Sequence, residues 1–324
     1  MHRMLRIAVA PACALAVCAA PVQAQVNFPA RAVVIVVPYT QGVSVDNIAR
    51  ILAARLGERW KQPVVVENRP GASGIIGTEF VARAAPDGHV LLFTVNTFAM
   101  APALFKKLPF DPLGDFAPVG RVAVSSYALA VNPQVPAKNF AELLALVRAR
   151  PGQLNYATPG NGTPHHLAME LMKQREGLAI VHVPYKGAAG AITDLLGGQV
   201  QMMFAPVPTL LPHARSGKAR FLAVTGERAA QVPEVPSFRE LGMEYMDAVD
   251  SWFALLAPGR TPQALVQRLN QDLRAVMDSP DARETLLKQG LRPSLSTPEE
   301  FSAQIRSDLA RWAKVVADGK ITAD

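Results

Sequence analysis

Short runs of β-branched and other apolar residues alternate with amphipathic stretches along most of the chain. In the first part the pattern predicts strands at 33–39, 64–67 and 89–95 and helices at 44–58 and 73–83. A second group predicts strands at 127–131, 154–157, 180–185, 200–204 and 221–225 and helices at 140–148, 163–174 and 188–196. This alternation is typical of an α/β protein with a mostly parallel sheet and helices on both of its faces.

Two proline-rich stretches, at 109–119 and 232–237, separate these groups and are expected to act as hinge regions. About 300 residues are too many for one ordinary core, so we expect two domains. The predicted division places residues 25–122 and 237–324 in lobe I and residues 123–236 in lobe II. A chain that leaves one lobe and later returns to it crosses twice, and both crossings can bend.

The C-terminal part of the chain, after residues 252–257, is predicted to be helical. Thr261 and Thr297 each precede a proline, as an N-cap residue precedes proline at the first helical position, and Glu300 completes a capping box with Thr297. These terminal helices are expected to pack on the first lobe.

The N-terminus has the features of a secretory signal peptide. Arg3 and Arg6 precede an apolar run at 7–17, and small residues around Ala24 offer a cleavage site. The run is shorter than the roughly 20 residues of a membrane-spanning helix. We therefore expect a periplasmic mature protein, residues 25–324.

Both cysteines of the sequence, Cys13 and Cys18, lie within this predicted signal peptide. Cleavage would leave a mature chain without disulfides, thiolate metal sites or cysteine nucleophiles. Lipidation at Cys18 remains open, because Val17 stands where such sites usually have a small residue.

Charge argues against a nucleic-acid partner. Two of the 33 basic residues and none of the 26 acidic residues lie in the predicted signal peptide, which leaves a formal charge of +5 on the mature chain. The basic residues are scattered and form no runs or aromatic-interleaved stripes. A modestly basic body can still attract anionic ligands.

A first candidate binding loop, residues 38–46, follows a predicted strand and opens a helix. Ligands of open α/β sheets bind at this position, where free helix amides carry a positive partial charge. Gly42 lets the backbone turn sharply and approach a ligand. An ordinary turn capped by Ser44 or Asp46 is the alternative. The candidate ligand-binding residues of this loop are Tyr39, Thr40, Gln41, Gly42, Val43 and Ser44.

A second candidate loop, residues 158–166, has the same strand-to-helix position, with Thr163 as N-cap and Pro164 at the first helical position. Neither loop contains a lysine or arginine, so an anion would be held by backbone amides and could be released without breaking a strong ion pair. The candidates here are Thr158, Gly160, Asn161, Gly162, Thr163 and His166.

Several other chemistries are not supported by the sequence. His165 and His166 point about 100° apart on a helix, and His166 with Glu170 gives only two ligands, so we expect no metal site. The glycines at 71–77 lack the spacing of a dinucleotide loop, and we expect no cofactor. A secreted hydrolase that uses Ser44 or Thr163 is a remaining alternative, although no standard catalytic motif is present.

Taken together, these loops and several further motifs resemble the substrate-binding proteins of tripartite tricarboxylate transporters, the TctC or Bug receptors. The resemblance extends over essentially the whole mature length. It rests on Phe28-Pro29, Val36–Tyr39 with Gly42, Asp46 and Ala49-Arg50, Val66–Ala72, residues 84–88, Gly160–Gly162 with His166-Leu167, Val183–Gly187, Asp194–Val200 and residues 233–237.

This resemblance implies a two-lobed type II periplasmic binding protein fold that closes on a small carboxylate and catalyses nothing. The implied partner is a membrane transporter, with a membrane sensor as the alternative, and the implied state is a monomer. The resemblance also adds Asn96 and Thr97, after the strand at 89–95, and Tyr185 and Lys186, after the strand at 180–185, as ligand-binding candidates. Asn96 capping a turn, Tyr185 in the core and Lys186 in solvent are the alternatives.

Val43 is a departure from the family pattern, which usually has a second glycine there. A β-branched residue tolerates a positive φ badly. We therefore expect either a different loop path or a turn shifted to Gln41-Gly42.

Overall fold

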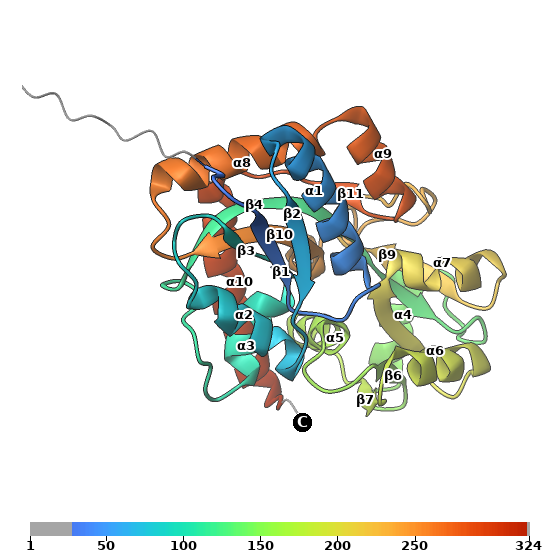
Figure 1. Ribbon diagram of the computed structural model, residues 1–324. Helices are drawn as coiled ribbons and strands as arrows, with labels where there is room; N and C mark the ends of the chain where they lie inside the picture. Colours follow the sequence, from blue (N-terminus) through green and yellow to red (C-terminus); the bar gives the residue numbers. More distant parts are fainter. Residues whose placement is uncertain (1–27, 323–324) are drawn as a thin grey trace, which may run out of the picture.

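The computed structural model describes residues 28–322, which form two lobes, each built on one β-sheet (Figure 1). The predicted signal peptide, with Cys13 and Cys18, lies outside the described residues. Within residues 28–322, no helix combines the length and the apolar character that crossing a bilayer requires.

The first lobe contains a six-stranded sheet in the order β11-β4-β10-β3-β1-β2. Strands β1, β2 and β3 run parallel, whereas β10 is antiparallel to both β3 and β4. Its strands are β1 (Val33–Val37), β2 (Val64–Asn68), β3 (Val90–Val95), β4 (Phe116–Ser125), β10 (Ser251–Pro258) and β11 (Arg292–Pro293).

The second lobe contains a five-stranded sheet in the order β7-β6-β8-β5-β9. Strand β6 runs parallel to β7 and β8, and β5 is antiparallel to β8 and β9. Its strands are β5 (Tyr127–Val131), β6 (Asn155–Thr158), β7 (Val181–Pro184), β8 (Met202–Pro206) and β9 (Arg220–Val224).

Helices cover both faces of each sheet, because side chains along a strand alternate between the faces. In the first lobe, Ile35 faces α1 (Ser44–Trp60) and α8 (Gln263–Met277), whereas Val36 faces α2 (Ile75–Ala82) and the start of α10. The second sheet lies between α4 (Phe140–Ala149) with α5 (Pro164–Glu176) and α6 (Ala188–Gly197) with α7 (Val207–Arg215). The remaining helical segments are η1 (Ala72–Gly74), α3 (Thr97–Leu104), η2 (Glu244–Val249) and α9 (Pro280–Lys288).

The C-terminal helix α10 (Pro298–Gly319) belongs to both lobes. It begins with the predicted capping box, in which the hydroxyl of Thr297 accepts from the amide of Glu300 at 3.1 Å. Phe301 in its first half packs in the first lobe, but Trp312 in its second half is buried in the core of the second lobe. The expected packing on the first lobe is observed for the first half of α10, whereas its second half packs on the second lobe.

Two further differences concern the sheets. Each sheet is mixed rather than mostly parallel, because the strands next to the crossovers, β4, β5, β9 and β10, pair antiparallel with their neighbours. In addition, part of the stretch expected as a linker at 109–119 is strand, since β4 begins at Phe116. The exact lobe boundaries given above remain predictions.

Candidate functional site

The two candidate loops occupy equivalent places in the two lobes. The first loop connects the carboxyl end of β1 to α1, and the second connects the carboxyl end of β6 to α5. In both, the start of the helix presents amide groups that have no intrahelical partner. The first helical amide with such a partner is that of Asn47 in α1 and that of Leu167 in α5.

The first loop is organised by the buried carboxylate of Asp46, which is 1% exposed. It accepts hydrogen bonds from the amide of Gly42 at 2.9 Å, the Nδ2 of Asn68 at 2.9 Å and the Nε of Arg50 at 3.0 Å. Burial alone would raise the pKa of Asp46, but these bonds and the charge of Arg50 together hold the pKa below its usual value. The carboxylate is thus ionised and neutralised within the loop.

Val43 takes the helix N-cap position with φ −77° and ψ 162°, an extended conformation that any residue adopts. The positive φ of the loop falls on Gly42, at +87°. Of the two expectations, the turn at Gly42 is the one observed. Val43 is therefore unstrained, and its side chain is 41% exposed.

Tyr39 points its hydroxyl back into the first lobe. The hydroxyl lies 2.5 Å from the Oγ1 of Thr97 and 3.3 Å from that of Thr94, and burial raises the pKa of Tyr39. The ring therefore ties the first loop to the start of α3. Thr40, Gln41 and Ser44 are exposed on the loop.

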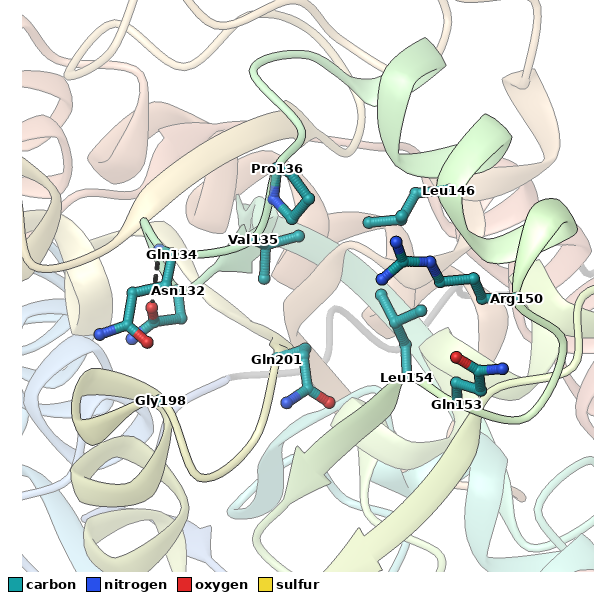
Figure 2. Close-up of a pocket in the computed structure, with 10 residues that line it drawn as sticks. All are labelled: Asn132, Gln134, Val135, Pro136, Leu146, Arg150, Gln153, Leu154, Gly198 and Gln201. Carbon is teal, nitrogen blue, oxygen red and sulfur yellow. Dashed lines mark hydrogen bonds between the residues drawn. The ribbon is translucent and has the colours of Figure 1, made fainter.

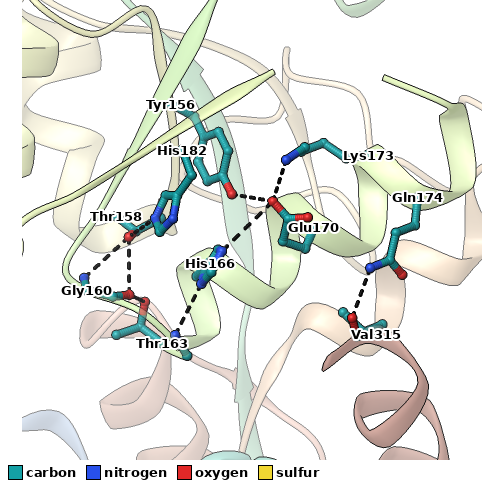
Figure 3. Close-up of polar contacts among 11 residues, drawn as sticks. Tyr156, Thr158, Gly160, Thr163, His166, Glu170, Lys173, Gln174, His182 and Val315 are labelled. Carbon is teal, nitrogen blue, oxygen red and sulfur yellow. Dashed lines mark hydrogen bonds and ion pairs between the residues drawn. The ribbon is translucent and has the colours of Figure 1, made fainter. Parts of the chain in front are cut away.

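The second loop is held by His166, which is 6% exposed (Figure 3). Its Nδ1 accepts a hydrogen bond from the amide of Gly162 at 3.1 Å, so this nitrogen carries no proton. Burial lowers the pKa of His166, which favours the neutral ring that the bond requires. Gly162 has φ +69°, a left-handed conformation that favours glycine.

The remaining polar groups of the second loop bond to one another. The hydroxyl of Thr163 donates to the carbonyl of Gly160 at 2.8 Å, and the amide of Gly160 donates to the Oγ1 of Thr158 at 3.3 Å. Thr163 is the N-cap residue, as predicted, but its hydroxyl makes no cap hydrogen bond. Asn161 is partly buried in the same loop.

A second layer of side chains supports His166. His182 stacks on it with ring centroids 3.9 Å apart, and the Nε2 of His182 lies 2.6 Å from the Oγ1 of Thr158. One turn further along α5, Glu170 accepts hydrogen bonds from the hydroxyl of Tyr156 at 2.6 Å and from the Nζ of Lys173 at 2.5 Å. The pattern of the sequence placed Glu170 on the face of His166, but it gave no sign of His182, which comes from the neighbouring strand β7.

The two loops share one hydrogen-bonding arrangement. In each, a glycine with positive φ donates its amide to the side chain four residues later, at the third position of the helix: Gly42 to Asp46, and Gly162 to His166. The glycine amides are therefore satisfied within the protein. The first-turn amides of α1 and α5, before those of Asn47 and Leu167, have no intrahelical partner.

Helix α3 connects the two loops. Its first residue, Thr97, bonds to Tyr39 of the first loop, and its last residue, Leu104, lies against Gly162 of the second loop. A Cβ added at Gly162 would lie 2.9 Å from the Cδ2 of Leu104. The second loop thus contacts the first lobe directly.

The remaining candidates, Asn96, Tyr185 and Lys186, come directly after strands β3 and β7. Asn96 and Tyr185 form hydrogen bonds with other side chains of the protein. Asn96 is 2% exposed and accepts a hydrogen bond from Ser251 at 3.0 Å, while its buried Nδ2 has no partner among the described residues. Tyr185 donates to Asp194 at 2.6 Å, and burial, followed by that carboxylate, raises its pKa to about 12. Lys186 is exposed.

The hydrolase alternative lacks a catalytic arrangement. The carboxylate of Asp46 is bonded to Gly42, Nδ1 of His166 is bonded to Gly162, and the hydroxyl of Thr163 donates to the carbonyl of Gly160, so these groups form no nucleophile–base pair with one another or with the exposed Ser44. Within residues 28–322, no three His, Cys, Asp or Glu side chains gather closely enough to hold a metal ion.

His165, at the end of the second loop and the start of α5, is expected to make the folded protein sensitive to acid. Its ring packs edge-on against Tyr127 with centroids 5.4 Å apart, and burial lowers its pKa from 6.5 to about 4. Below pH 6.5 the His165 ring is protonated in the unfolded chain, whereas in the folded protein it stays neutral until about pH 4. The free energy of unfolding therefore falls as the pH falls from 6.5 to 4.

We expect His165→Phe to remove this contribution, which amounts to about 2 kcal/mol between pH 7 and pH 5. Urea unfolding of both proteins at the two pH values measures it. Equal losses of stability in the wild type and the variant would contradict the assignment to His165.

Several known proteins are similar to this chain over most of its length. The family model described as tripartite tricarboxylate transporter family receptor matches residues 48–320. Protein BugT of Bordetella pertussis is 38% identical over 304 residues, which cover 93% of this chain and 92% of BugT.

Two similar solved structures are from Rhodopseudomonas palustris. One, solved with adipate, is 33% identical, with a TM-score of 0.74 and coverage of 91% of this chain and 99% of its own. The other, MatC with bound malate, is 32% identical, with a TM-score of 0.69 and coverage of 89% and 100%.

The fold and these similarities define a solute-binding protein with the two-lobed type II fold, a class that binds and does not catalyse. The resemblance inferred from the sequence is thereby confirmed. The chain belongs to the tripartite tricarboxylate transporter receptor family, the TctC or Bug proteins, whose members are periplasmic binding proteins.

Proposed function

We propose that this protein is exported to the periplasm, captures a small carboxylate between its lobes and presents it to a membrane transporter. The observation that carries the proposal is the pair of loops in which a glycine amide bonds to the third side chain of the following helix, while the first-turn amides of that helix have no intrahelical partner. The adipate and malate in the two similar structures support the choice of a carboxylate.

The two loops would contribute differently to the binding of an anion. The second loop contains a neutral imidazole, so the dipole of α5 acts on the ligand without opposition. The first loop contains the carboxylate of Asp46, whose charge is compensated by Arg50 at 3.0 Å. We therefore place an anionic group of the ligand at the start of α5, and a second polar or anionic group at the start of α1.

Thermal unfolding of residues 25–324 with a panel of carboxylates tests this function. A ligand that binds only the native state adds about 2.7 kcal/mol at one hundred times its dissociation constant. Adipate, malate, succinate, citrate, glutamate and aromatic acids form the panel, and the matching amides are the controls. Stabilisation by at least one acid, and not by its amide, is expected. Refolded protein that responds to no acid in the panel would contradict the proposal.

A further inference from the structure

A pocket of about 290 Å³ opens on the second lobe, and ten residues line it (Figure 2). It lies between the chain that follows β5, the end of α4, the start of β6 and the turn after α6. None of its lining residues belongs to the first or second loop. All of them come from residues 132–201, so the shape of the pocket does not depend on closure of the lobes.

The side chains that line the pocket carry one positive charge and no negative charge. Arg150 is its one ionisable side chain, and no acidic residue lines the pocket. Within the described part of the chain, Arg150 forms no ion pair; its backbone amide ends α4 by donating to Leu146 and Val147. Figure 2 shows the guanidinium extending across the pocket toward Leu146 and Leu154. An unpaired guanidinium over a partly apolar surface is suited to a carboxylate.

Amide side chains form the opposite wall, and two of them are held in place. Asn132 donates to the carbonyl of Leu195 at 2.7 Å and accepts from the amide of Gln134 at 2.8 Å. The Oε1 of Gln201 accepts from the amide of Asn155 at 2.9 Å, which leaves its NH₂ group to donate to an acceptor in the pocket. The NH₂ group of Gln201 is therefore held in place before a ligand arrives, so little of its conformational entropy is lost on binding.

The floor of the pocket is apolar. Val135 and Leu154 are each 6% exposed, and Leu146 covers one side. A cavity that combines an apolar surface with a few fixed polar groups is typical of a small-molecule site. The apolar surface here adjoins the guanidinium, so a ligand needs an acidic end and a hydrocarbon body.

We propose that this pocket is a second ligand site, which binds a small monocarboxylate with a hydrocarbon chain. Arg150 and the NH₂ of Gln201 receive the carboxylate, and Val135, Leu146 and Leu154 contact the chain. This site is separate from the loop site and does not rest on the function proposed above.

Titration of the full mature protein with hexanoate, followed by the ¹⁵N–¹H signals of the Gln201 and Gln153 side chains, tests the proposal. We expect these signals to shift with hexanoate and not with hexanamide, which has the same chain without the charge. Arg150→Gln should weaken the binding about tenfold or more, because a charge-assisted bond is lost.

Arg148→Gln is the matched control, since Arg148 is exposed on the same helix and pairs with Glu176 at 3.4 Å, outside the pocket. It should bind hexanoate as the wild type does. Equal affinity of wild type and Arg150→Gln, equal binding of hexanamide, or shifts confined to residues 38–46 and 158–166 would each overturn the proposal.

Discussion

Replacing Gly162 with valine is expected to abolish carboxylate binding while leaving most of the protein folded. The φ of +69° is a region that a β-branched residue strongly disfavours, and the new side chain would meet Leu104 of α3. The loop would then leave its present path and lose the bond from the Gly162 amide to His166. We expect an affinity loss of about a hundredfold or more, equivalent to about 3 kcal/mol, and isothermal titration with the best acid of the panel measures it.

Gly177→Val is the matched control for this variant. Gly177 ends the same helix, α5, with φ +63°, and an added Cβ would meet no atom within 4 Å. The Gly177→Val substitution therefore imposes a backbone strain comparable to that of Gly162→Val, about 1–2 kcal/mol, at the opposite end of α5 from the second loop. Loss of stability with normal binding is expected for Gly177→Val. Normal binding by Gly162→Val would remove the second loop from the site.

The strands that the sequence predicted well are those whose apolar runs are uninterrupted. Strand β5 was predicted at its observed limits, because all of its residues are buried between α4 and α7 and none of them is glycine or proline. Strand β4 was missed, since Pro118 and Gly120 interrupt its pattern. Gly120 is not a turn residue here: an added Cβ would lie 2.7 Å from the side chain of Asn270, so the glycine allows a close approach of α8.

Helix α3 was not predicted, because its apolar run has no polar interruption. Phe98, Ala99, Met100 and Ala101 are all buried, so the segment has no polar face and therefore no helical period. Pro102 within it also argued against a helix. The element that links the two loops is thus one whose sequence carries almost no helical signal.

The candidate loops could be located from the sequence because their position depends on local order: strand, glycine, helix start. The side chains that hold them could be recognised only in part. The spacing of four residues from Gly42 to Asp46, or from Gly162 to His166, is visible in the sequence, but the hydrogen bond between each pair is not. The support from His182 depends on the pairing of β6 with β7, which the order of residues does not reveal.

The largest effect in the first lobe is expected for Asp46→Asn. The amide keeps the size of the side chain but turns an NH₂ group toward the donors of Gly42, Asn68 or Arg50, so at least one of these donors loses its acceptor. Removing one partner of a buried ion pair costs about 3–5 kcal/mol. Because Arg50 is 42% exposed and can be rehydrated, we expect about 3 kcal/mol of stability to be lost, together with carboxylate binding.

The pH dependence of this variant supplies an internal check. The pKa of Asp46 is held below its usual value in the folded protein. The stability that the ionised carboxylate provides is therefore present above about pH 4 and is lost as the pH falls through the folded pKa. The difference in unfolding free energy between wild type and Asp46→Asn should therefore narrow below about pH 4. Guanidinium unfolding from pH 7 to pH 3 measures it.

Asp272→Asn separates the effect on the loop from the general cost of altering a buried carboxylate. Asp272 is 7% exposed on α8 and accepts from Arg59 at 2.5 Å and from Trp60 at 2.8 Å, at the other end of α1. Both variants should lose stability, but only Asp46→Asn should lose affinity for the carboxylate. If both bind equally well, the start of α1 does not contact the ligand, and the carboxylate is held by the second loop alone.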